Sequence, residues 1–215
     1  MSGTLGVLLA GGAGSRLGSG VPKPEFVVHG LTLRERALAT LAAACDRVVI
    51  VTPRDRRPDV IGESAWIEDQ GDGPLSGIVA GLTADTFDRA LVLGVDFPLV
   101  RPALLLALLD ELTQSRAPAV MCAPGGIPQP LVAALSPAAA DALRDAFAAG
   151  ERSVTRAMVA MGAAMVGDDF VIAHGGGPAA LMNVNTPEDA AAAQRALAER
   201  ERLEPSHSPP GGDRA

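Results

Sequence analysis

The sequence is poor in lysine, aromatic residues, histidine and cysteine. Of its 18 basic residues only Lys23 is a lysine, and aromatic residues make up 3% of the chain. The two cysteines, Cys45 and Cys122, are too few for a disulfide framework or a cysteine-rich zinc site. With only three histidines, the chain also offers little for chemistry that depends on imidazole.

Positive charge and long apolar runs are lacking as well. The 25 acidic and 18 basic residues give a net charge of −7, which argues against nucleic acid as a partner because that needs a basic face. Anionic substrates must therefore be bound by local groups. No apolar run approaches the ~18 residues of a membrane span. The first residues do not resemble a secretory signal, so we expect a cytoplasmic protein that does not bind membranes.

What is present is an alternation of apolar strands and helices. With 48% apolar and 20% charged residues in 215 positions, the chain is long and apolar enough for one well-packed domain, predicted over residues 1–203. The Pro/Gly/Ser-rich residues 204–215 predict a disordered tail. The order of elements predicts a mostly parallel sheet covered by helices on both faces. Strands are expected at 4–10, 47–52, 65–67, 89–95, 119–123, 131–135 and 182–184, and helices at 34–45, from 77, at 102–112, 137–149, 153–161 and after Thr186.

The loop after the first strand has the composition of an anion-binding loop. Its glycines allow backbone N–H groups to approach phosphate oxygens closely. Arg16 adds a planar guanidinium and Lys23 a compact ammonium. Lys23 is followed by a proline, so the loop is not a P-loop, and its glycines are out of register with G-x-G-x-x-G. A glycine-rich turn without a ligand is the alternative.

Two carboxylates stand at predicted strand ends. Asp96 follows a buried apolar strand, where a bare carboxylate is costly unless it is paired. Mg²⁺ fits such a position because it binds one or two carboxylates together with substrate phosphates. A helix cap is the alternative for Asp96, although Pro102 begins the next helix six residues later. Asp69, taken alone, reads as an exposed carboxylate at a strand end.

The motifs follow one another in an order that resembles a known family. The run Leu9–Gly18 (L-A-G-G-x-G-x-R-L-G) with the lysine after it resembles the opening signature of nucleotidyltransferases. G-P-L-x-G from Gly73, D-x-P from Asp96, G-E-R from Gly150 and N-V-N-T-P-E-D from Asn183 follow. With them, about residues 5–195 resemble the molybdenum cofactor guanylyltransferases. The resemblance implies a Rossmann-like, three-layer α/β/α nucleotidyltransferase fold with a mostly parallel, mixed sheet.

The resemblance also implies an activity: Mg²⁺-dependent transfer of GMP from GTP to the terminal phosphate of molybdopterin, which releases pyrophosphate. Lys23, Arg16 and Asp96 would be catalytic, with Asp96 as the metal ligand, and Asp69 would help to hold guanine. Other molybdenum cofactor synthesis or insertion proteins are the expected partners. Nucleotide-binding residues would be Leu9, Ala10, Gly11, Gly12, Gly14, Lys23, Asp69, Gly77 and Asp96, and those near the second substrate or the metal would be Gln129, Pro130, Arg152, Asn183 and Asn185.

The roles of two asparagines, and two differences from the motifs of the family, leave questions open. Asn183 and Asn185 alternate on the predicted strand 182–184 and beyond, so at most one is expected to face the site. The loop up to Lys23 is one residue longer than the R-M-G-x-D-K form, and Pro22-Lys23 resembles cytidylyltransferases and sugar nucleotidyltransferases. Val48–Pro53 offers no asparagine where the family has a base-contacting one. A cytidylyltransferase acting on molybdopterin or an alcohol phosphate, and a non-catalytic nucleotide-binding module, are the alternatives.

Overall fold

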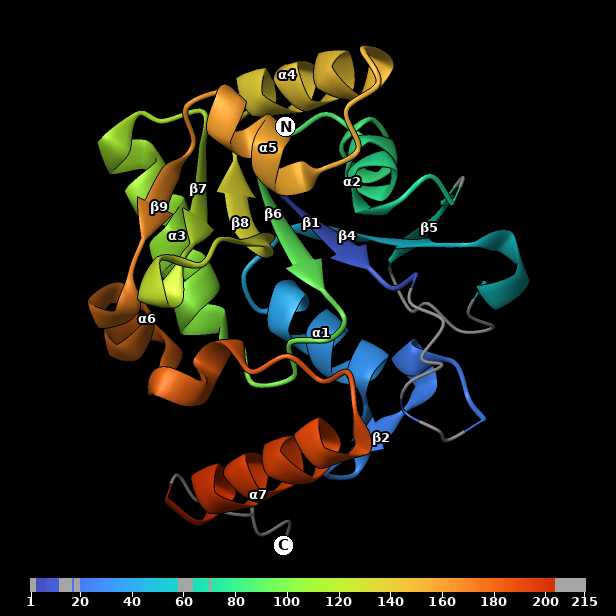
Figure 1. Ribbon diagram of the computed structural model, residues 1–215, viewed down its shortest axis with the longest axis vertical. Coiled ribbons are helices and arrows are strands. Elements are labelled where there is room, and N and C mark those ends of the chain that lie inside the picture. Colours follow the sequence, from blue (N-terminus) through green and yellow to red (C-terminus); the bar gives the residue numbers. More distant parts are fainter. Residues whose placement is uncertain (1–2, 12–16, 18–19, 58–63, 70, 204–215) are drawn as a thin grey trace, which may run out of the picture.

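A single mixed sheet forms the centre of the molecule. The computed structural model describes residues 3–11, 17, 20–57, 64–69 and 71–203. Within them, seven strands pair in the order β5-β4-β1-β6-β8-β7-β9 (Figure 1). The strands are β1 (Thr4–Leu9), β4 (Arg47–Thr52), β5 (Ala65–Glu68), β6 (Arg89–Gly94), β7 (Ala119–Cys122), β8 (Gln129–Leu135) and β9 (Ala164–Val166).

One strand of this sheet runs against the others. β1 is parallel to β4 and β6, β4 to β5, and β7 to β9, whereas β8 is antiparallel to both β6 and β7. The short loop between β7 and β8, with the 3-10 turn Pro124–Gly126, allows only a reversal, because a parallel return needs a long crossover. The start of β8 therefore lies at the same sheet edge as the ends of β1, β4, β5 and β6. The predicted mostly parallel, mixed sheet is confirmed.

Helices cover both faces of the sheet, as predicted. The buried apolar residues form two clusters, one on each face, and the sheet strands contribute to both. Such double burial explains why the strands read as continuous apolar runs. On one face lie α2 (Pro74–Leu82), α4 (Pro137–Ala148) and α5 (Val154–Ala160). The other cluster takes in α1 (Leu33–Ala42), α3 (Pro102–Ser115), α6 (Asp168–Gly175) and α7 (Pro187–Leu203).

A small hairpin follows the first loop and lies beside α7 (Figure 1). It pairs β2 (Val27–Val28) with β3 (Leu31–Thr32). Its turn residues His29 and Gly30 have φ angles of +52° and +78°, the left-handed backbone of a tight hairpin turn. The sequence does not predict this hairpin, because two-residue strands carry no measurable alternation. The 3-10 turn Lys23–Glu25 leads into it.

The predicted strand at 182–184 is wrong. Met182–Asn185 has no ladder partner and follows the 3-10 turn Pro178–Leu181. The segment instead makes one backbone hydrogen bond with the loop after β6, from Val184 N to Asp96 O at 2.8 Å. β9 and α6 had not been predicted, and residues 170–181, which showed no clear pattern, hold the end of α6 and that turn.

Candidate active site

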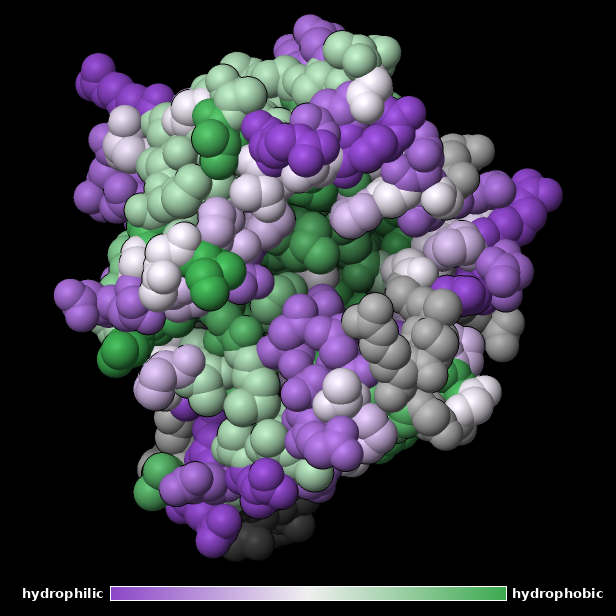
Figure 2. Space-filling model, viewed as in Figure 1, coloured by the Kyte–Doolittle hydropathy of each residue, from purple (hydrophilic) through white to green (hydrophobic). Residues whose placement is uncertain are grey.

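A cavity of about 340 Å³ opens where β1, β4, β5 and β6 end. We call it the first cavity. Its floor is apolar, from Leu9, Val51, Val95 and Leu131, and Figure 2 shows an apolar hollow bordered by hydrophilic residues on this face of the molecule. Strand ends are where ligands bind in sheets of this type. The remaining lining residues are Gly11, Lys23, Pro53, Asp69, Gly71, Gly73, Pro74, Gly77 and Asp96.

The only lysine of the chain lies in this cavity and is held by two polar side chains. Lys23 is only 8% exposed. Its Nζ donates to Asn185 Oδ1 at 2.7 Å and lies 3.3 Å from Asp96 Oδ2. An ammonium has three protons, so these two partners leave one donor for a ligand. The ammonium of Lys23 therefore connects three parts of the chain: the N-terminal loop, the end of β6 and the segment before α7.

Asp96 occupies its position because a glycine makes room for it. A Cβ atom at Gly94, the last residue of β6, would lie 2.5 Å from Asp96 Oδ1 and 3.2 Å from Leu131 Cβ. Backbone bonds fix the turn, since Val95 N donates to Leu9 O at 3.0 Å and Phe97 N to Gly94 O at 3.4 Å. Pro102, not Asp96, stands at the first turn of α3. Asp96 thus pairs with Lys23 rather than capping a helix.

Asp69 forms the opposite wall with two glycines. Its Oδ1 accepts the Gly71 N–H at 3.0 Å, which closes a turn around the carboxylate. A Cβ at Gly11 would lie 3.2 Å from Asp69 Oδ2, and one at Gly77 would lie 3.8 Å from Asp69 Cγ. Gly11 therefore keeps space beside the carboxylate, whereas a Cβ at Gly77 would instead approach Leu9 Cδ2, at 3.2 Å. The nearby Thr52 is buried, and its hydroxyl donates to Ala10 O at 3.3 Å, so within the part of the chain that the structure describes Asp69 is the polar side chain that this wall presents.

The described residues fit a divalent cation only together with a substrate. No group of three or more His, Cys, Asp or Glu side chains that could hold a metal occurs among them. Asp96, however, lines the cavity with its side chain 17% exposed. One carboxylate, completed by phosphate oxygens and waters, is a common arrangement for Mg²⁺. Asp96 is thus a fitting ligand for a metal that arrives with a nucleotide.

The glycine-rich loop is described only in part. Gly12, Gly14 and Arg16, predicted to bind or act on the nucleotide, lie outside the described residues. Gly11 lines the first cavity, and its carbonyl accepts from Arg56 Nη1 at 3.1 Å. Ala10 is not among the lining residues: it is buried, and its N–H donates to Val51 O at 2.9 Å.

A second cavity of about 330 Å³ adjoins the first, because Pro74 and Leu131 line both. The start of β8 lies here, since this strand runs against its neighbours. The cavity brings together the predicted second-substrate residues Gln129, Pro130, Arg152 and Asn183. Its other lining residues are Phe97, Ser153, Val154 and Thr155.

Asn183 and Asn185 do not point in opposite directions. Asn185 Nδ2 donates to Asn183 Oδ1 at 2.8 Å, so the two side chains touch. The expectation of alternate faces was wrong because it required a strand. Asn185 reaches Lys23, whereas Asn183 lines the second cavity. The two asparagines therefore connect the cation of the first cavity with the wall of the second.

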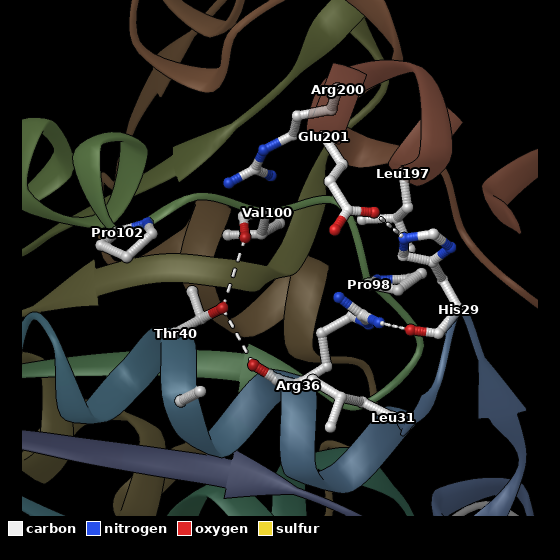
Figure 3. Close-up of a pocket in the computed structure, with 11 residues that line it drawn as sticks. His29, Leu31, Arg36, Thr40, Pro98, Val100, Pro102, Leu197, Arg200 and Glu201 are labelled. Atoms are coloured by element: carbon white, nitrogen blue, oxygen red, sulfur yellow. Dashed lines mark hydrogen bonds and ion pairs between the residues drawn. The ribbon is translucent and has the colours of Figure 1, made fainter. Parts of the chain in front are cut away.

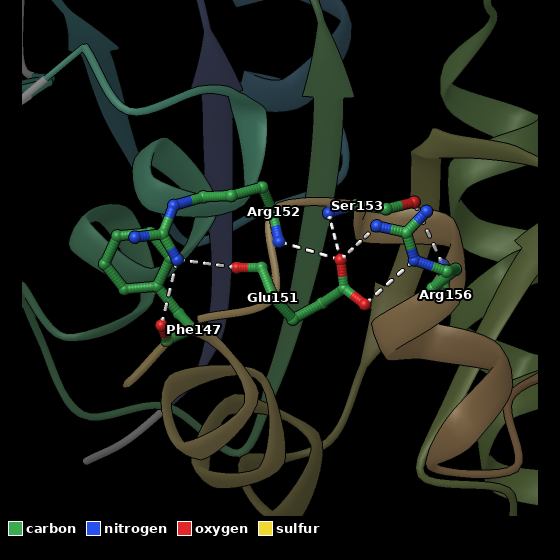
Figure 4. A network of polar contacts seen from close by, with 5 residues as sticks. All are labelled: Phe147, Glu151, Arg152, Ser153 and Arg156. Carbon is green, nitrogen blue, oxygen red and sulfur yellow. Dashed lines mark hydrogen bonds and ion pairs between the residues drawn. The ribbon is translucent and has the colours of Figure 1, made fainter. Parts of the chain in front are cut away.

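A polar network at the G-E-R segment shapes the rim of the second cavity (Figure 4). The Glu151 carboxylate accepts the Arg152 and Ser153 N–H groups, both at 2.7 Å, and pairs with the Arg156 guanidinium at 2.7 Å. The hydrogen bond from Arg156, followed by these backbone bonds, lowers the pKa of Glu151 to about 2. The ionised Glu151 carboxylate thus fixes the backbone of Arg152 and Ser153 through these hydrogen bonds.

A larger cavity lies elsewhere, among α1, the β2–β3 hairpin, α7 and the loop before α3. We call this space of about 450 Å³ the hairpin cavity (Figure 3). Several of its polar groups contact one another or the backbone: His29 Nε2 lies 2.9 Å from Glu201 Oε2, and Arg36 Nη2 donates to Val28 O and His29 O at 2.7 and 2.9 Å. These contacts hold the hairpin against α1 and α7. Arg36 Nε, by contrast, is buried without a hydrogen-bond partner among the described residues. Size alone therefore does not mark the candidate site.

Some lining residues of the first two cavities were not predicted. Val51, Pro53 and Val95 are ordinary strand-end residues, and no signal in the sequence separates them from the core. Pro74 and Leu131, shared by the two cavities, could have been found from their places in the G-P-L-x-G and Q-P-L segments. The cysteines have no role here, since burial raises the pKa of both thiols to about 12.

Comparisons with known proteins identify the family of this chain. Residues 6–164 match the family model of the MobA-like NTP transferase domain. A probable molybdenum cofactor guanylyltransferase of Chloroflexus aggregans is 34% identical over 86% of this chain and 90% of its own length. The molybdenum cofactor guanylyltransferase of Pseudomonas aeruginosa strain PAO1 is 31% identical over 85% and 90%.

Solved structures share the fold. Molybdopterin-guanine dinucleotide biosynthesis protein A from Archaeoglobus fulgidus superposes with a TM-score of 0.77 at 24% identity, covering 91% of this chain and 99% of that one. The 2-C-methyl-D-erythritol 4-phosphate cytidylyltransferase of Thermus thermophilus reaches 0.69 at 22% identity, covering 93% and 100%. The family match over most of the chain, together with the expected motifs around one cavity, shows that this chain belongs to the MobA-like NTP transferases and is a nucleotidyltransferase.

Proposed function

We propose that this chain transfers the GMP part of GTP to the terminal phosphate of molybdopterin and releases pyrophosphate. The observation that carries the proposal is the meeting of Lys23, Asp96 and Asn185 beside a second cavity that contains Gln129 and Arg152. Two adjoining spaces suit a reaction that joins two molecules. The names of the relatives supply the substrate pair.

The transfer depends on positioning the two substrates more than on acid–base catalysis. An oxygen of the molybdopterin phosphate forms the new bond to the α-phosphorus of GTP, while the bond from that phosphorus to the bridging oxygen of pyrophosphate breaks. A phosphate monoester is already anionic at pH 7, so no side chain has to remove a proton. Catalysis then rests on holding the two phosphates in line and balancing the charge.

The residues of the first cavity divide these tasks. Asp69 would accept N–H groups from the Watson–Crick edge of guanine. The third proton of Lys23 would bind phosphate oxygens and balance the charge of the departing pyrophosphate. Asp96 would hold Mg²⁺, which supplies positive charge at the phosphates when it is bound. Asn185 would keep Lys23 in place through the 2.7 Å hydrogen bond.

Several expectations go with this proposal. GTP as the nucleotide, molybdopterin as the acceptor and Mg²⁺ as the metal all belong to it, as does a cytoplasmic location, where GTP is available. Among the described residues, no helix is both long and apolar enough to cross a bilayer. The involvement of other molybdenum cofactor synthesis or insertion proteins stays a prediction.

A cytidylyltransferase is the second candidate, and the wall beside Asp69 is compatible with it. The wall beside Asp69 carries Pro53 and Val51 and a Thr52 hydroxyl that is bonded to Ala10 O. Among the described residues it thus offers one polar side chain for the base, and a carboxylate can accept from the amino group of cytosine as well as from guanine.

The test supplies the protein with molybdopterin, Mg²⁺ and each nucleoside triphosphate in turn, and measures pyrophosphate release. GTP should support the highest kcat/KM. A preference for CTP would replace the guanine assignment by the second candidate. Absence of pyrophosphate with every nucleotide would favour a non-catalytic nucleotide-binding module.

A further inference from the structure

An ion pair joins the loops of the two adjoining cavities. Asp72 lies between Gly71 and Gly73, both of which line the first cavity, and Arg152 lines the second. Arg152 Nε is 2.9 Å from Asp72 Oδ2. Gly71 and Gly73 have φ angles of +79° and +89°, a backbone shape that favours glycine and that presents Asp72 to Arg152.

The guanidinium of Arg152 has only one edge left for an anion. Its carbon stands 4.4 Å from the centre of the Phe147 ring, so one face is covered. Nη1 donates to Phe147 O at 3.1 Å and to Glu151 O at 2.9 Å, which uses both protons of that nitrogen (Figure 4). A guanidinium binds a carboxylate or phosphate through two parallel N–H groups. For Arg152 these can only be Nε and Nη2, and the Asp72 carboxylate already lies 2.9 Å from Nε as an ion pair.

The pair is poorly placed to serve stability. The side chains of Asp72 and Arg152 are 53% and 46% exposed, and exposed ion pairs typically contribute only about 0–1 kcal/mol. The Arg152 side chain is positioned without Asp72, by the Phe147 ring and two carbonyls. Its backbone is held by Glu151. Asp72 is therefore not needed to hold Arg152 in place.

We infer that Asp72 is an internal competitor: it occupies the anion-binding edge of Arg152, and the phosphate of the second substrate binds by displacing it. The inference rests on the proposed function, because it takes the second substrate to be a phosphate monoester. Competition of this kind reduces the apparent affinity by the fraction of molecules in which the edge is blocked. It leaves the reaction between the bound substrates unchanged.

The first test compares the steady-state kinetics of four proteins: the wild type, Asp72→Asn, Arg152→Gln and the double variant. We expect Asp72→Asn to lower the KM for the second substrate about three- to tenfold, with kcat and the KM for the nucleotide within twofold of wild type. In the Arg152→Gln background the same change should have no effect on that KM. Asp85→Asn is the matched control, since Asp85 forms an exposed ion pair with Arg47 at 2.8 Å away from both cavities.

The outcomes separate the possible roles of Asp72. A raised KM in Asp72→Asn would mean that Asp72 supports the site, and would overturn the inference. An equal decrease in the Arg152→Gln background would show that Asp72 acts by general repulsion, and would overturn it too. An unchanged KM would show that the pair is irrelevant to binding.

A second readout does not depend on turnover. Inorganic phosphate is titrated into the full-length protein while the N–H signal of Arg152 Nε is followed by NMR. The dissociation constant should fall about three- to tenfold in Asp72→Asn relative to wild type. Equal constants would overturn the inference. If the wild type releases no pyrophosphate but the titration shows the shift, the proposed function fails and the competition stands.

Discussion

The first cavity and the hairpin cavity differ in how their polar groups are used. The hairpin cavity is larger, about 450 against 340 Å³, yet His29 contacts Glu201 and Arg36 Nη2 donates to two backbone carbonyls. Arg36 Nε has no partner among the described residues, but it is buried. In the first cavity, Lys23 keeps one donor, and Asp69 presents a carboxylate beside two glycines. The difference teaches that polar side chains placed at strand ends mark a site better than cavity volume or a single unpaired donor does.

The largest effect should come from Asp96. We expect Asp96→Asn to lower kcat/KM by roughly 10³-fold, because the proposed metal ligand and the anionic partner of Lys23 are both lost. Pyrophosphate release measures this, and an unchanged melting temperature confirms the fold. Glu201→Gln, a carboxylate change in the hairpin cavity, is the control and should stay within twofold. Comparable losses in the two variants would remove the distinction between the cavities.

Asp69 should affect the choice of base rather than the chemistry. Asp69→Asn replaces an acceptor-only group by one that also donates, so we expect a rise of about tenfold in the KM for GTP with kcat nearly constant. Initial rates at varied GTP concentration measure it. A kcat loss as large as that of Asp96→Asn would place Asp69 at the reacting phosphates instead.

Substitution of Arg36 should reduce stability rather than activity. Its Nη2 joins α1 to the hairpin through two backbone carbonyls, so Arg36→Gln should lower the free energy of unfolding by about 1–2 kcal/mol. Activity at 25 °C should remain within twofold. Denaturant unfolding and pyrophosphate release are the two measurements. A large loss of activity without a loss of stability would give the hairpin cavity a catalytic role.

The smallest effect concerns acid stability at the rim of the second cavity. Because the pKa of Glu151 lies near 2 in the folded protein, below its unfolded value of about 4.3, its stabilising contacts are complete above that value. They are lost as the pH falls toward 2. The difference in unfolding free energy between wild type and Glu151→Gln should therefore shrink over this range. A difference independent of pH would contradict the assignment.

The sheet and the main motifs could be predicted because their signals are local. Apolar runs such as Arg47–Thr52 stop at prolines and glycines, and Asp69 and Asp96 follow such runs, so the sequence places both at one edge. The meeting of Asn183 with Asn185 was not predictable, since it depends on an irregular segment held by Asp96 O. The pairing of Asp72 with Arg152 joins residues 80 positions apart and follows from the packing of α2 near α4 and α5.

Lys23 tests the central claim most directly. At 8% exposure, with two of its three donors used, its position suits a compact ammonium and not a planar guanidinium. The measurement is pyrophosphate release by Lys23→Arg, with Arg200→Lys in the hairpin cavity as the reciprocal control. We predict a loss of at least about 100-fold in kcat/KM for Lys23→Arg and less than twofold for Arg200→Lys. A Lys23→Arg enzyme as active as wild type would show that catalysis does not depend on this lysine.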